Sequence, residues 1–115
     1  MHKDWKQVAK ELSGLMAETR RGIPGVGKAF QQLAAAATAE GALDTKTKEL
    51  IALAVGITAR CDGCVAFHAG AAVRHGANRE EVLETIGMAI YMGGGPSLVY
   101  GAQALEAYDQ FAEAG

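Results

Sequence analysis

Apolar side chains recur at intervals of three and four positions along most of this chain, the spacing of one face of an α-helix. This pattern predicts a first helix over about residues 3–20, which the Gly- and Pro-containing stretch 20–25 should end. A second helix is expected from about 26 to 40, with Gly41 as its C-terminal stop. The strict alternation of apolar and polar residues that marks a strand is not evident, so the pattern gives little support for a β-sheet.

The segment 45–59 is apolar around most of its circumference. Asp44 or Thr45 can cap it, because a short oxygen side chain accepts hydrogen bonds from the free N–H groups of a first helical turn. A helix that is apolar nearly all round is normally buried on all sides. A bundle of this size has little room for such a helix, so we expect neighbouring subunits to cover part of it.

Three further segments complete the predicted architecture. After a break at 60–63, a fourth helix should run to about His75 and end at Gly76. Asn78 and Glu81 have the spacing of a capping box, which predicts a helix from there to about Gly93. Beyond the Gly94-Gly95 joint, Pro96 suits the first turn of a last helix, which extends to about Ala112. We therefore predict an all-α, single-domain helical bundle of five or six helices that spans residues 1–115.

Composition and charge narrow the class of protein. Half of the 115 residues are hydrophobic, which excludes intrinsic disorder, and the net charge of -2 argues against a dedicated nucleic-acid binder. The N-terminus lacks the apolar stretch of a signal peptide, and the longest apolar run, 50–57, is far below the roughly 20 residues that a membrane helix needs. We therefore expect a cytoplasmic protein with no membrane contact. We also expect His2 to lie in a frayed N-terminus. In a reducing compartment, two cysteines rarely form a structural disulfide.

The candidate chemistry lies in Cys61-Asp62-Gly63-Cys64 and in His68. In a helix that begins near Cys61, these two cysteines and His68 share one face, and the cysteine Cα atoms lie roughly 5 Å apart, within disulfide range. The first turn of a helix favours a thiolate, which is the nucleophilic form of cysteine. Because Cys64 is one turn from His68, which can accept its proton, we assign Cys64 as the attacking thiolate and Cys61 as the resolving cysteine.

Glu49 is the fourth candidate residue. It stands near the start of the apolar helix, 12 positions before Cys61. A carboxylate beside an imidazole orients the ring and raises its basicity, so a contact with His68 would complete a proton relay. The sequence leaves open whether the two helices bring these side chains together. Glu49 is also an ordinary first-turn acid, a position that the helix dipole favours in any protein.

Glu49, the apolar helix and the pattern Cys61-x-x-Cys64-x-x-x-His68 together resemble the core motif of the alkylhydroperoxidase D branch of the carboxymuconolactone decarboxylase family. The resemblance covers roughly residues 25–110 and is most specific over 45–76. It implies an all-helical fold that assembles into trimers or hexamers, and thiol-dependent peroxidase or disulfide-reductase activity. It also implies that Cys64 is peroxidatic, that Cys61 resolves, and that Glu49 and His68 relay the proton.

Two departures from that branch stand out. The best-known peroxidases of this type carry a histidine immediately before the second cysteine, where this chain has Gly63. The chain also has about the length of one repeat unit, whereas the full-length peroxidase has an additional N-terminal half. The decarboxylase branch lacks the cysteine pair, which argues against lactone chemistry here.

We therefore expect a homo-oligomeric, antioxidant thiol-dependent peroxidase or disulfide oxidoreductase that needs no bound cofactor. Its partners would be a hydroperoxide or disulfide substrate and a thiol reductant, such as a lipoyl group or a thioredoxin-like protein. The alternatives are a non-redox family member, either a metal- or ligand-binding module or a decarboxylase-type enzyme, and a pair of inert buried cysteines. For a metal site, Cys61, Cys64, His68 and Glu49 have suitable ligand types, but a second ligand pair with zinc-site spacing is missing from the sequence.

Overall fold

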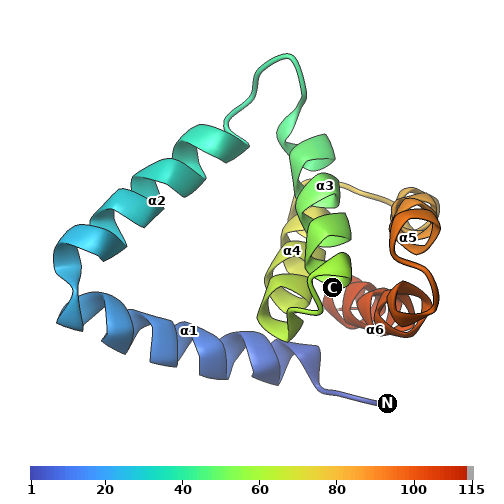
Figure 1. Ribbon diagram of the computed structural model, residues 1–115, viewed down its shortest axis with the longest axis horizontal. Helices are drawn as coiled ribbons and strands as arrows, with labels where there is room; N and C mark the ends of the chain where they lie inside the picture. Colours follow the sequence, from blue (N-terminus) through green and yellow to red (C-terminus); the bar gives the residue numbers. More distant parts are fainter. Residues whose placement is uncertain (114–115) are drawn as a thin grey trace.

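The computed structural model describes residues 1–113, which form six helices and no strand (Figure 1). None of these helices is long and apolar enough to cross a bilayer. The predicted all-α architecture is therefore confirmed. The helices are α1 (Trp5–Gly22), α2 (Pro24–Thr38), α3 (Thr45–Thr58), α4 (Asp62–Arg74), α5 (Arg79–Gly93) and α6 (Gly95–Ala112).

Helices α3 to α6 pack together and enclose the hydrophobic core, and α1 lies against α4 and α6. Leu53 and Ile57 of α3 and Val65 of α4 are fully buried there. The backbones of α5 and α6 approach closely at Gly101, where a Cβ atom would come within 2.6 Å of Ile86. The core therefore fixes α4, the helix that carries the cysteine pair, against three other helices.

The helix boundaries follow the predicted capping residues. Asp44 caps α3 by accepting a hydrogen bond from the N–H of Thr47, and Asn78 and Glu81 form the expected capping box of α5. The break between α1 and α2 is shorter than predicted and consists of Ile23 alone. Pro24 begins α2 because its fixed φ suits a first helical position, where a missing N–H costs nothing.

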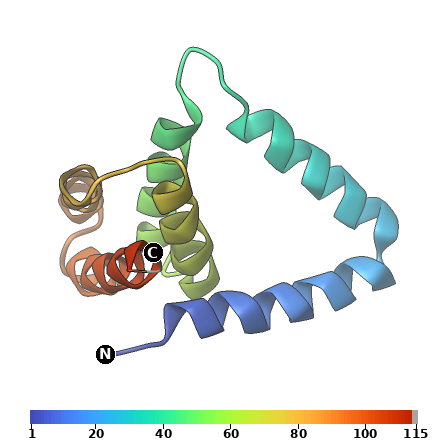
Figure 2. The same cartoon turned by 180° about the vertical axis from the view of Figure 1, so that it is seen from behind.

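Helices α1 and α2 form an arm that leaves the rest of the bundle and returns to it through the loop before α3 (Figures 1 and 2). Within residues 1–113, α2 packs only against α1 and α3. Several large apolar side chains are consequently exposed on the arm: Leu15, Met16, Ile23, Val26, Phe30 and Leu33.

The apolar helix α3 is less buried within one chain than its composition suggests. Ile51 is 48% exposed and Val55 is 60% exposed. They line shallow apolar hollows between α3 and α5, together with Met88. One chain therefore does not bury this helix on all sides, as expected, and leaves apolar residues exposed on its outer face.

The N-terminal strap, residues 1–4, is bound to α6, so the prediction of a fraying terminus at His2 was wrong. The backbone N–H groups of His2 and Lys3 both donate to the carboxylate of Glu106, at 2.6 and 3.0 Å. The indole N–H of the buried Trp5 donates to the same carboxylate at 2.8 Å. One glutamate on α6 therefore collects three donors and holds the start of the chain in place.

These donors, the backbone N–H of His2 first among them, lower the pKa of Glu106 from 4.5 to about 2. A carboxyl group whose pKa is lowered by folding stabilises the native contacts above its unfolded pKa, and this contribution is lost as the pH falls through the folded value. We therefore expect the strap to detach between about pH 4.5 and 2. The fluorescence of Trp5, the only tryptophan, should report this transition.

The matched variant is Glu106→Gln, which should show altered Trp5 fluorescence already at neutral pH and no separate transition in that acid range. Far-ultraviolet circular dichroism distinguishes release of the strap from unfolding of the bundle. An acid transition of unchanged midpoint in the variant would contradict the assignment to Glu106.

Candidate functional site

The cysteine pair is positioned by a tight turn between α3 and α4. The N–H of Cys61 donates to the carbonyl of Gly56 at 3.0 Å, and the N–H of Arg60 donates to that of Ile57 at 3.1 Å. These two bonds are those of a Schellman motif at the end of α3, with Arg60 in the left-handed region at φ 56°. Because the motif ends at Cys61, the chain enters α4 at once, and the first cysteine is held by the end of the preceding helix.

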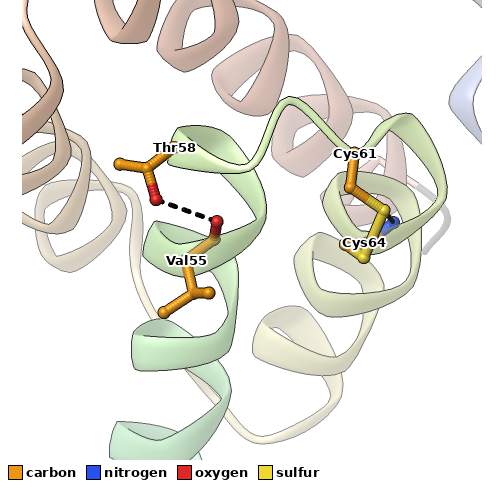
Figure 3. Close-up of a disulfide and its surroundings, with 4 residues drawn as sticks. All are labelled: Val55, Thr58, Cys61 and Cys64. Atoms are coloured by element: carbon orange, nitrogen blue, oxygen red, sulfur yellow. Dashed lines mark hydrogen bonds between the residues drawn. A yellow bond between two sulfur atoms is a disulfide. The ribbon is translucent and has the colours of Figure 1, made fainter.

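Cys61 is the N-cap of α4, and its sulfur accepts a hydrogen bond from the N–H of Cys64 at 3.2 Å. The two sulfurs are joined in a disulfide, with the Cα atoms 5.2 Å apart. Figure 3 shows this bond at the start of α4, beside the last turns of α3 that carry Val55 and Thr58. The observed spacing agrees with the predicted one, so a dithiol and a disulfide can interconvert here without a large backbone movement.

Glu49 and His68 meet across the interface of α3 and α4. Oε1 of Glu49 lies 2.7 Å from Nδ1 of His68. Glu49 is only 7% exposed, whereas the side chain of His68 is 33% exposed and can reach solvent or a substrate. A carboxylate accepts hydrogen bonds, so a neutral imidazole would donate from Nδ1 to Glu49 and keep Nε2 as its acceptor. The structure therefore joins the two residues whose contact the sequence left open.

Cys64 is packed against α3 at a glycine. A Cβ atom on Gly56 would lie 3.0 Å from Cβ of Cys64, which is tighter than ordinary van der Waals contact. The absence of a side chain at Gly56 thus lets the start of α4 approach α3 closely. The sequence indicated no role for this glycine, because a glycine inside an apolar helix gives no sign of which residue it faces.

The arm reaches the motif through Leu12 of α1. A Cβ atom built on Gly63 would come within 2.8 Å of the terminal methyl Cδ1 of Leu12. A side chain at position 63 would therefore require the end of the Leu12 side chain to move. Neither Leu12 nor α1 could be linked to the motif from spacing, since they are far from it in sequence.

A metal site was the alternative interpretation of the motif, but residues 1–113 contain no preformed metal site. No group of three or more His, Cys, Asp and Glu side chains in this part of the chain is arranged to hold a metal ion. The two sulfurs form a disulfide, and the carboxylate of Glu49 is hydrogen-bonded to His68. The arrangement supports thiol–disulfide exchange with a proton carrier nearby more directly than it supports coordination.

Comparison with known families and proteins identifies the family of this chain. The model of the carboxymuconolactone decarboxylase family matches residues 24–107. An uncharacterized protein from Cupriavidus necator is 38% identical over 109 residues, which cover 95% of this chain and 96% of that protein. An uncharacterized protein from Haemophilus influenzae is 41% identical over 108 residues, with 94% and 96% coverage.

Solved structures of similar proteins belong to the same family. A carboxymuconolactone decarboxylase family protein from Legionella pneumophila, in its apo form, superposes with a TM-score of 0.92 at 49% identity and covers 95% of this chain and 97% of its own. A family member from Thermotoga maritima, for which a part in an antioxidative response has been suggested, superposes with a TM-score of 0.71 at 30% identity. That match covers 85% of this chain and 90% of the other.

Proposed function

Because the chain belongs to the carboxymuconolactone decarboxylase family, we propose that it is an oxidoreductase of the alkylhydroperoxidase D type, a thiol-dependent peroxidase or disulfide reductase. The observation that carries the proposal is the pairing of Cys61 and Cys64 at the start of α4, with the Glu49–His68 pair centred one turn beyond Cys64. The antioxidative role suggested for the relative from Thermotoga maritima supports the same activity.

In the proposed cycle, the Cys64 thiolate attacks one oxygen of a hydroperoxide, and the O–O bond breaks. The attacked oxygen stays on sulfur as a sulfenic acid, and the other oxygen leaves as an alcohol after it takes up a proton. Cys61 then attacks the Cys64 sulfur, which forms the disulfide and releases water. The hydroperoxide has gained two electrons, and the cysteine pair has lost them.

His68 is the proton carrier in this cycle. Its Nε2 accepts the proton of the Cys64 thiol and returns it to the departing oxygen, and Glu49 stabilises the protonated ring through the 2.7 Å hydrogen bond. An external dithiol, such as a lipoyl group or a thioredoxin-like protein, then reduces the disulfide by exchange and closes the cycle. With a disulfide as substrate, the same Cys64 thiolate attacks sulfur in place of oxygen.

We also propose that the protein acts in the cytoplasm as a homo-oligomer, a trimer or a hexamer. The support is the amount of apolar surface that one chain leaves exposed on the arm and along α3 and α5. Monomeric soluble proteins rarely leave large apolar patches uncovered. A second copy of the chain, which carries the same two surfaces, is the partner that this proposal requires.

The test is turnover of cumene hydroperoxide with dihydrolipoamide or dithiothreitol as the reductant. The proposal predicts saturable, protein-dependent oxidation of the dithiol. A rate equal to that without protein would contradict it. Stoichiometric zinc by elemental analysis would favour a metal-binding module. Decarboxylation of a small-molecule substrate that survives replacement of both cysteines by serine would favour a decarboxylase-type enzyme.

A further inference from the structure

Asp62 lies between the two cysteines in the sequence and is the first residue of α4. A negative charge beside a cysteine opposes the formation of a thiolate, because like charges repel. The carboxylate also competes with the sulfurs for the positive end of the α4 dipole, which otherwise favours a thiolate at this position. Without compensation, Asp62 would therefore destabilise the reduced form of the pair.

Lys3 supplies that compensation. Its ammonium nitrogen lies 2.6 Å from Oδ2 of Asp62 and 5.3 Å from the ring centre of Trp5. The other oxygen, Oδ1 of Asp62, is buried and has no hydrogen-bond partner among residues 1–113. Both side chains are partly exposed, and an ion pair of this kind contributes little to folding stability. We expect the ion pair to act instead on the electrostatic potential at the two sulfur atoms.

The backbone of Lys3 is held by α6, independently of Asp62. Its backbone N–H donates to Glu106 at 3.0 Å, and its carbonyl accepts from the side-chain amide of Gln110 at 2.6 Å. The same amide group of Gln110 accepts from the N–H of Trp5 at 2.7 Å. Glu106 and Gln110, one turn apart on α6, thus hold the backbone of Lys3 within reach of Asp62.

We propose that Lys3 is a positioning residue that sets the reduction potential of the Cys61–Cys64 pair by holding a positive charge against Asp62. This inference rests on the redox function proposed above. The thiolate occurs only in the reduced form, so an uncompensated Asp62 destabilises that form and makes the disulfide harder to reduce. Loss of Lys3 therefore lowers the reduction potential, and loss of Asp62 raises it.

The experiment equilibrates the full chain with glutathione buffers of known ratio and measures the fraction of disulfide by thiol alkylation. For Lys3→Gln we expect the equilibrium constant for reduction to fall threefold to tenfold, a decrease of about 15–30 mV. Asp62→Asn should shift the constant in the opposite direction, and the double variant should return close to the wild-type value. Lys3→Arg keeps the charge and should keep the potential, and Lys6→Gln, at an exposed lysine of α1, controls for net charge.

The pH dependence separates an electrostatic role from a structural one. Arg60, Glu49 and His68 are common to all variants, so differences between variants isolate the Lys3–Asp62 pair. The difference between Lys3→Gln and wild type should vanish in acid, where both thiols are protonated, and should grow as the thiolate forms. A shift that is equal at every pH, or no shift at all, overturns the role of Lys3. Failure of the wild-type pair to form a reversible disulfide would instead overturn the proposed function, and this inference with it.

Discussion

Replacement of Cys64 by serine is expected to abolish hydroperoxide-dependent oxidation of a dithiol. A hydroxyl group is not ionised near neutral pH, so the variant has no nucleophile of comparable strength at this position. We expect the rate to fall by about three orders of magnitude or more, as it does when a covalent nucleophile is removed from other enzymes. Steady-state consumption of cumene hydroperoxide with a dithiol reductant provides the measurement.

Cys61→Ser is the matched control, because it removes the other sulfur from the same turn. If Cys61 resolves, this variant should still react once with hydroperoxide and then stop with a sulfenic acid on Cys64. Trapping with a sulfenic acid reagent, followed by mass analysis, identifies the modified residue. Sulfenic acid on Cys61 in the Cys64→Ser protein, with turnover retained, would reverse the assignment of the two roles.

Glu49→Gln is expected to reduce turnover about 10²-fold to 10⁴-fold, the range typical of general acid–base groups. Glutamine has nearly the volume of glutamate and can still accept the hydrogen bond of His68 Nδ1, so the buried site should keep its shape. It cannot supply the negative charge that stabilises a protonated ring. The loss should therefore appear in turnover and in its pH profile, while thermal stability changes little.

Glu84→Gln serves as the control for this variant, because Glu84 is an exposed glutamate on α5, away from the motif. His68→Gln should reproduce the loss seen in Glu49→Gln, and the double variant should be hardly worse than either single one, since the two residues act as one unit. Additive losses in the double variant, or wild-type turnover in Glu49→Gln, would contradict a proton relay through this pair.

Features set by local chemistry could be predicted from the sequence. Asp44 caps α3, and Asn78 with Glu81 caps α5, because capping depends on residues within one turn of each other. The spacing of Cys61 and Cys64 fixed their Cα separation for the same reason. The break near Ile23 was expected to be longer, since Gly and Pro allow several chain paths and only packing selects one.

Features that depend on how helices cross could not be predicted. The contact between Glu49 and His68 requires a particular packing of α3 on α4, which the periodicity of either helix does not specify. The placement of Leu12 over Gly63 and of Lys3 beside Asp62 depends on where the arm and the strap return to the bundle. A charged residue near the N-terminus gives no indication in the sequence that it is held near a cysteine pair.

The most direct test of the redox assignment is thiol titration of the reduced protein before and after one equivalent of cumene hydroperoxide. We expect two free thiols before the addition and none after it. Peptide mapping by mass spectrometry should then find Cys61 linked to Cys64, and dihydrolipoamide should restore both thiols. Two free thiols that persist after the hydroperoxide is added would contradict a redox role of Cys61 and Cys64.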